Sequence, residues 1–150
     1  MKPSTIRIIM IALLYLPGSG ALGGGAALSI SPSGQMIDRV PVSILKNSPF
    51  HDFQIPGIIL FVVPGVAPVL ISSALIKKPT SLIADRFNLF KDMHWSWSIS
   101  IYTAFALIIW IQTETVMLSA GHWLQTFYTA LAVVVLFVAL QPKVRGFYKK

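Results

Sequence analysis

The chain has 150 residues, of which 55% are hydrophobic and only 11% are charged. Soluble domains carry about 25% charged residues, so this deficit indicates a protein whose solvent is lipid. The net charge of +7 does not indicate a nucleic-acid partner, because the basic residues are not interleaved with polar and aromatic ones on a soluble face. Cysteine is absent, which excludes disulfides, thiolate nucleophiles and zinc-thiolate sites. The length allows one bundle-sized transmembrane domain.

The first predicted span covers about residues 6–30 and contains Arg7 as its only charge. A spanning helix needs about 20 mostly apolar residues. Pro17-Gly18 predicts a bend, because proline removes a helical hydrogen bond and clashes with the preceding turn. Gly20 and Gly24 have the spacing of a small-residue helix-packing face. The alternative is an ordinary span with a Pro-Gly kink.

A cleavable signal peptide is a second interpretation of the same segment. Lys2 and Arg7 would form its positive region, residues 8–16 its apolar core and residues 25–27 its small-residue tail. The apolar character continues past the kink, as in a true span, so we expect the segment to be retained.

Residues 31–54 predict the first loop, which begins with the turn sequence Ser31-Pro32-Ser33-Gly34. Apolar residues between Met36 and Leu45 recur at roughly helical spacing, and Pro41 limits the length of any helix. We therefore expect a short amphipathic segment that lies in the membrane interface and packs on the bundle.

The second predicted span covers about residues 56–76 and carries no charge. Pro56 falls in the first turn, where proline is tolerated. Pro64-Gly65 predicts a bend and a helix-packing contact, because neighbours must satisfy the carbonyl groups that a mid-membrane proline frees. A broken helix at an ion or substrate site is the alternative.

The remaining chain predicts two more spans. Residues 77–94 form a second loop with a short surface helix, and His94-Trp95-Ser96-Trp97 is typical of an aromatic belt at a membrane interface. The third span covers about residues 98–118, and a tight turn separates it from the fourth span at about residues 123–140. A basic tail follows. The expected fold class is all-α, an integral membrane antiparallel four-helix bundle.

The distribution of Lys and Arg predicts the orientation. The N-terminus, the second loop and the tail together hold ten of these residues, and the other side holds only Arg39 and Lys46. Positive residues mark the cytoplasmic side. We therefore expect both termini in the cytoplasm of a bacterium, a multi-pass protein of the inner membrane, and an extracytoplasmic first loop.

Glu114 is the most conspicuous candidate for chemistry, because a carboxylate inside a span is costly and often functional. The predicted topology places it with other polar groups near the outer side. The candidate polar site comprises Glu114, Gln112, His122, Gln125, His51, Asp52 and Arg39. The alternative is a structural role, in which Glu114 faces the bundle and bonds to the first loop or to the start of the fourth span, so that the loop is fastened as a lid.

No spacing in the sequence indicates a metal or cofactor. HExxH, CxxC and EF-hand patterns are absent, as are nucleophile-elbow serines and a phosphate-binding glycine loop. We expect no catalytic residues, no metal and no cofactor. The basic tail is expected to meet anionic lipid headgroups.

Several segments together carry a resemblance to a known group. They are Gly23-Gly24-Gly25 leading to Ser31-Pro32-Ser33-Gly34, residues 45–60 (LKNSPFHDFQIPGIIL), Trp110-Ile111-Gln112, residues 124–128 (LQTFY) and residues 142–145 (PKVR). The chain resembles a widespread family of small four-span bacterial membrane proteins with an SPF…IPG motif. The resemblance implies the architecture over nearly the whole chain, and it implies no activity and no catalytic residues.

Three functions are compatible with these patterns. The first is a non-enzymatic structural or accessory protein of the bilayer that packs with itself or with a larger membrane complex. The second is a proton-coupled carrier component that uses Glu114 and the proline-broken second span. The third is an outer-leaflet protein that binds or acts on lipid or a small molecule. Convergence of the polar side chains on one open pocket would favour the second or third.

Overall fold

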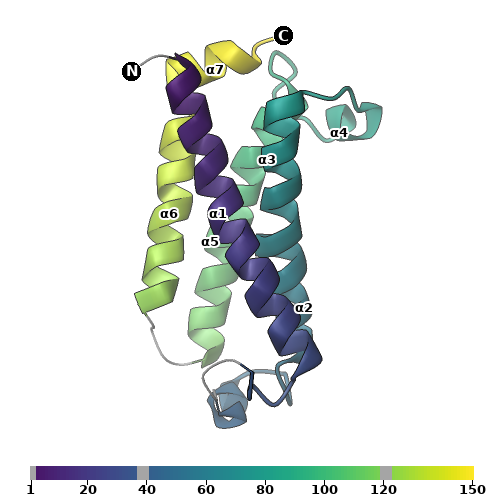
Figure 1. Cartoon of the computed structure of the whole chain (residues 1–150), viewed down its shortest axis with the longest axis vertical. Coiled ribbons are helices and arrows are strands. Elements are labelled where there is room, and N and C mark those ends of the chain that lie inside the picture. The colour runs from purple at the N-terminus through teal and green to yellow at the C-terminus, as the bar shows by residue number, and fades with distance from the viewer. Residues whose placement is uncertain (1–2, 37–40, 119–122) are drawn as a thin grey trace.

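A computed structural model describes residues 3–36, 41–118 and 123–150 (Figure 1). Within these ranges the regular elements are helices, and no strand forms. The elements are α1 (Pro3–Ile30), the 3-10 helix η1 (Val42–Asn47), α2 (Gln54–Leu60), the π-helix η2 (Phe61–Val66), α3 (Ala67–Lys77), α4 (Leu82–Arg86), α5 (Trp95–Leu118), α6 (Trp123–Ala139) and α7 (Pro142–Tyr148).

The expected all-helical class is confirmed, and several of these helices are long and apolar enough to cross a membrane. The helical segments Thr5–Ile30, Gln54–Lys77 and Trp95–Met117 are each long and apolar enough. The α6 helix passes the same criterion only together with α7, from which it is bent by 70°. The second and third segments begin earlier than the sequence predicted, at Gln54 and Trp95.

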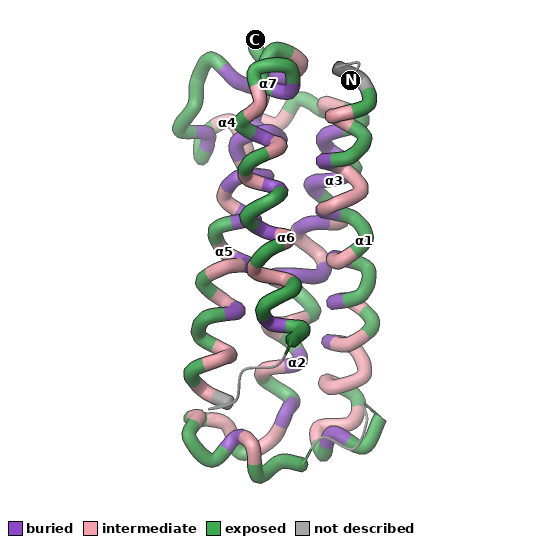
Figure 2. The backbone as a smooth tube through the Cα atoms, turned by 90° about the vertical axis from the view of Figure 1, so that its left-hand side faces the viewer, coloured by how far each residue is buried: buried purple, intermediate pink, exposed green. Residues whose placement is uncertain are grey.

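The long segments lie side by side, and successive ones run in opposite directions (Figures 1 and 2). Both termini lie at one end of the molecule, where α7 lies across the helix ends and α4 extends to the side. The η1 helix lies at the opposite end. The short helix α4 thus forms where the sequence predicted one in the second loop, and η1 overlaps only the end of the segment predicted between Met36 and Leu45. The helix α7 was not predicted, because its residues were interpreted as a basic tail.

The buried core is concentrated toward the end that carries the termini (Figure 2). Its largest fully buried side chains include Trp97, Tyr148, Met10 and Leu75. A smaller cluster follows farther along α5 and α6. The outer faces of the long helices carry exposed apolar side chains such as Ile8, Leu16, Leu70, Ile109, Val133 and Phe137. A surface this apolar suits lipid rather than water.

Among the described glycines, the tightest contacts lie where α1 crosses α2 and the start of η2. A Cβ atom added to Gly25 would lie 2.5 Å from the Phe61 backbone nitrogen, and one added to Gly57 would lie 2.8 Å from the Ser29 nitrogen. Real Cβ atoms essentially never come so close. These two glycines therefore permit backbone-to-backbone contact, as small residues do in membrane helix pairs.

The predicted packing glycines make looser contacts than this crossing. A Cβ atom at Gly20 would lie 3.4 Å from the Tyr128 hydroxyl, and one at Gly24 would lie 3.8 Å from Leu60. Gly65 is tighter, since its Cβ would lie 3.2 Å from the Leu22 backbone nitrogen. The tightest α1 contact is thus one residue beyond the predicted pair, at Gly25.

The two proline positions behave differently. The α1 helix continues through Pro17. In the second segment the α-helical pattern changes to a π-helix over Phe61–Val66, and this π-helix contains Pro64. A π-turn at this point is consistent with the hydrogen bond that Pro64 cannot donate.

Candidate functional site

The candidate polar site centres on Glu114, which lies inside the segment Trp95–Met117 and is half-buried. Its neighbours Thr113 and Thr115 donate hydroxyl hydrogen bonds to carbonyl groups of their own helix, at 2.8 and 2.7 Å. Gln112 is exposed on the outside of the same helix. These side chains therefore do not form a polar path along α5.

The other members of the polar site come from separate elements. Gln125 is buried on α6, and His51 is exposed in the loop before α2. The Asp52 carboxylate accepts a hydrogen bond from the Gln54 backbone nitrogen at 2.9 Å, so it serves the first turn of α2. None of the described members lines the central cavity described below.

Arg39 and His122 lie outside the described residues. The bonds that we predicted from Glu114 to these two residues therefore also fall outside the described part of the chain. The remaining first-loop cation, Lys46, is exposed and makes no ion pair with Glu114. Within the described ranges no group of three or more His, Cys, Asp or Glu residues could hold a metal ion.

The SPF…IPG segment has a structural explanation. The Ser48 hydroxyl donates to the Leu45 carbonyl oxygen at 2.9 Å and accepts from the Phe50 backbone nitrogen at 3.2 Å. Phe53 is buried, and its backbone nitrogen donates to the Pro32 carbonyl oxygen at 3.0 Å. The motif thus closes the first loop and leads the chain into the α1–α2 crossing.

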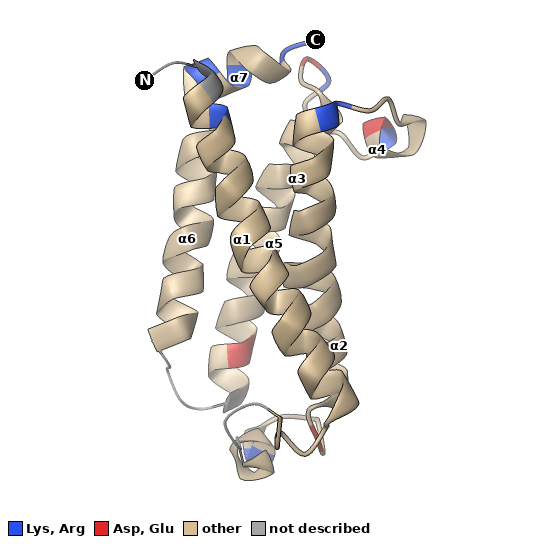
Figure 3. Cartoon of the chain, viewed as in Figure 1, with Lys and Arg blue, Asp and Glu red and all other residues tan. Residues whose placement is uncertain are grey.

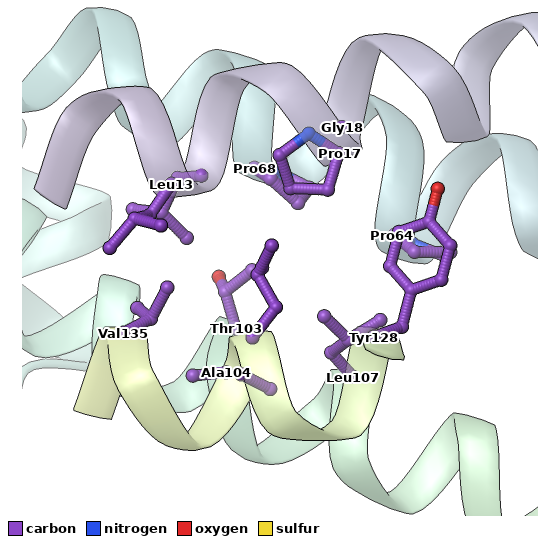
Figure 4. A pocket seen from close by; sticks show the side chains of 13 residues that line it. Leu13, Pro17, Gly18, Pro64, Pro68, Thr103, Ala104, Leu107, Tyr128 and Val135 are labelled. Atoms are coloured by element: carbon purple, nitrogen blue, oxygen red, sulfur yellow. The ribbon is translucent and has the colours of Figure 1, made fainter. Parts of the chain in front are cut away.

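A small apolar cavity lies where the long helices meet (Figure 4). Its walls include Pro17 of α1, Pro64 of η2, Thr103 of α5 and Tyr128 of α6. Its volume of about 10 Å³ corresponds to roughly one water molecule. The cavity marks the gap left around the proline positions and is too small for a substrate.

A group of polar contacts lies at the end that carries the termini. We call residues 142–150 the C-terminal clasp. The Tyr148 hydroxyl donates to the Leu75 carbonyl oxygen at 2.9 Å, and the Arg7 guanidinium donates to the Ile76 carbonyl oxygen at 3.3 Å. The last carbonyl groups of a helix lack partners within the helix. The C-terminal clasp and α1 therefore supply hydrogen-bond donors to the last carbonyl groups of α3.

Cations and aromatic rings reinforce this contact. Lys78 ends α3 in a left-handed conformation with φ of 47°, and its ammonium group donates to the Phe147 carbonyl oxygen. The ammonium lies 4.8 Å from the centre of the Tyr148 ring, and the Arg7 guanidinium lies 5.4 Å from the centre of the Phe147 ring. Burial, followed by the nearby Arg7 charge, lowers the pKa of Lys78.

The last residues of the clasp pair with the chain just before α5. The His94 backbone nitrogen donates to the Tyr148 carbonyl oxygen at 2.6 Å, and an antiparallel bridge joins Met93 to Lys149. Burial lowers the pKa of His94, and the Lys78 charge adds to this effect. These contacts join the end of α3, the start of α5 and the C-terminal clasp. Sequence reasoning missed them, although Val144 and Tyr148 have helical spacing.

Comparison with known proteins yields no match: no family model, no curated protein and no solved structure is similar to this chain.

Proposed function

We propose that the chain is a small multi-pass membrane protein without an active site of its own, which acts as a structural or accessory component by packing with itself or with a larger membrane complex. The observation that carries this proposal is that none of the described candidate polar side chains lines the central cavity. Gln112 and His51 are exposed, and the Asp52 carboxylate accepts a hydrogen bond from the nearby Gln54 backbone nitrogen. The central cavity adds support, because it holds only about one water molecule.

The proposed architecture is an antiparallel four-span bundle in a bacterial inner membrane. The α6 helix has 17 residues, which gives it a length of about 26 Å, close to the roughly 30 Å of a bilayer's hydrocarbon core. Basic residues gather at the end that holds both termini and α4 (Figure 3). The positive-inside rule assigns that end to the cytoplasm and the η1 end to the outside.

The exposed side of α1 favours packing between chains. Gly23 is exposed, and a Cβ atom added to it would meet nothing within 4 Å. Leu16 and Ile8 are also exposed on this helix. A smooth apolar face with an accessible glycine allows a second helix to approach closely in a membrane.

Stoichiometry in a native-like extract tests this proposal. The protein is extracted with a polymer that keeps a lipid annulus, and the particles are weighed by native mass spectrometry. We expect a fixed assembly of two or more chains, or of this chain with one constant partner. Particles that hold a single copy and no other protein, over the full range of expression levels, would contradict the proposal.

A carrier component that uses Glu114 is the second candidate function. It is favoured by a half-buried carboxylate inside a span that forms no ion pair with any described residue. Proton flux in reconstituted vesicles separates the two candidates. A carrier that uses Glu114 should lose flux on the substitution Glu114→Gln. A structural component should show the same low flux with and without this substitution.

A further inference from the structure

The segment of residues 79–92, which we call the α4 segment, connects α3 to α5 and extends sideways from the helix ends (Figure 1). It begins just after one membrane-spanning segment ends at Lys77 and finishes just before another begins at Trp95. Its position in the chain therefore places it at the depth of the lipid headgroups.

Both ends of the α4 segment are held in place by hydrogen bonds. The Trp95 indole nitrogen donates to the Pro79 carbonyl oxygen at 2.7 Å. The buried Asn88 side chain donates to the Met93 carbonyl oxygen at 2.8 Å. These contacts fix the course of the segment close to both helix ends.

The middle of the α4 segment is also fixed. The Leu89 backbone nitrogen donates to the Tyr102 hydroxyl at 3.0 Å. The Asp85 carboxylate pairs with the Lys150 ammonium at 2.8 Å, and this hydrogen bond lowers the pKa of Asp85. The conformation of the segment is thus set by polar contacts and does not depend on burying its apolar side chains.

Those apolar side chains point away from the protein. Leu82, Ile83, Phe87 and Leu89 are between 69% and 93% exposed. Four large apolar groups on a segment this short form a patch that soluble surfaces avoid. An ordered segment that presents such a patch requires an apolar neighbour outside the chain.

The charges beside the patch identify that neighbour. Arg86, on the same short helix, is exposed and makes no hydrogen bond or ion pair with a described residue. Lys77 and Lys91 are exposed at the two ends of the segment, and the Lys91 ammonium also donates to the Asp85 carbonyl oxygen at 2.8 Å. The Asp85 carboxylate is already paired, and the exposed Asp92 offsets one of the three cations. The net charge beside the patch is therefore positive and complements phosphate.

We propose that the α4 segment is an in-plane anchor that inserts its four exposed apolar side chains into the headgroup region of the adjacent leaflet and binds anionic phospholipid through Arg86. Apolar groups on one side and basic groups beside them are the pattern of interfacial helices, which bind anionic membranes most strongly. This inference rests on the proposed membrane placement, and it is independent of whether the chain assembles with itself.

Depth-dependent fluorescence quenching tests the anchor. The chain has no cysteine, so Ile83→Cys gives a single labelling site for a fluorophore. The labelled protein is reconstituted in vesicles of phosphatidylcholine and phosphatidylglycerol. Nitroxide groups are placed near the headgroup of one lipid or the other, and iodide serves as the water-soluble quencher.

We expect the label to be quenched by lipid nitroxides and shielded from iodide, and phosphatidylglycerol nitroxide to quench more strongly than phosphatidylcholine nitroxide. Arg86→Gln should reduce this preference by up to about fivefold, the factor expected for one basic residue at a membrane surface. Arg86→Lys should retain most of the preference. Lys46→Gln, an exposed basic position in η1, is the matched control and should change nothing.

Three results would overturn the inference. Quenching by iodide alone would place the segment in water. Shielding from iodide and from both lipids would show that protein covers the patch, either a second copy or a partner. Equal quenching by both lipids would contradict the preferential binding of anionic phospholipid. Since the assembly state is measured separately by mass, failure of the anchor and failure of the proposed function are distinguishable.

Discussion

Gly25→Ala is expected to destabilise the protein by about 3 kcal/mol, at the upper end of the usual range for overpacking. The added methyl group would lie 2.5 Å from the Phe61 nitrogen, 2.7 Å from its Cα atom and 2.8 Å from the Gly57 carbonyl oxygen. These are backbone atoms, so no side-chain rotation can relieve the contact. The helices α1 and α2 must therefore separate. Unfolding in mixed detergent micelles, followed by circular dichroism, measures the loss.

Gly23→Ala is the matched control for this substitution. It makes the same chemical change on the same helix, but the new methyl group meets nothing within 4 Å. Alanine favours a helix over glycine by roughly 0.5–1 kcal/mol, so this variant should be as stable as the wild type or slightly more stable. Equal destabilisation by the two substitutions would contradict the observed crossing of α1 and α2.

Trp97→Ala is expected to cost about 3–5 kcal/mol, the usual range for truncating a large buried aromatic side chain. The Trp97 side chain is 1% exposed and packs edge-to-face on Phe90 with ring centres 5.4 Å apart. Its indole nitrogen donates to the Ala139 carbonyl oxygen at 2.9 Å, so it joins α5 to the end of α6. Thermal unfolding in detergent measures the effect.

Two further variants separate the contributions of this side chain. Trp97→Phe keeps a ring but loses the hydrogen bond to Ala139, so it should fall between the wild type and Trp97→Ala. Trp123 is 68% exposed at the other end of α6, and Trp123→Ala should cost less than 1 kcal/mol, roughly the size of surface substitutions. A larger loss of stability for Trp123→Ala than for Trp97→Ala would contradict a core that lies toward the end carrying the termini.

Periodicity and turn chemistry were sufficient to predict most of the helical elements. The short helix α4 appeared where apolar residues recur at helical spacing, and Pro64 lies where the regular helix is interrupted. Sequence reasoning missed α7 because four basic residues dominate the tail. The informative signal was Pro142 in the first turn, followed by Val144 and Tyr148 one turn apart.

The packing positions and the polar site were harder to predict. The sequence places Glu114 and Gln112 near one end of their helix, but the rotation of that helix depends on neighbours that a linear pattern does not define. Gln112 consequently faces outward while Glu114 is half-buried. In the same way, the run of glycines allowed either a packing face or a plain kink, and only the crossing geometry selects Gly25 from that run.

Labelling of single cysteines from one side of the membrane tests the transmembrane placement most directly. Ser43 in η1 and Lys149 in the C-terminal clasp are both exposed and lie at opposite ends of the molecule. A membrane-impermeant maleimide should label Ser43→Cys on intact cells, and it should label Lys149→Cys only after the membrane is permeabilised. Labelling of both positions on intact cells, or of neither before permeabilisation, would contradict a chain that crosses the membrane with both termini in the cytoplasm.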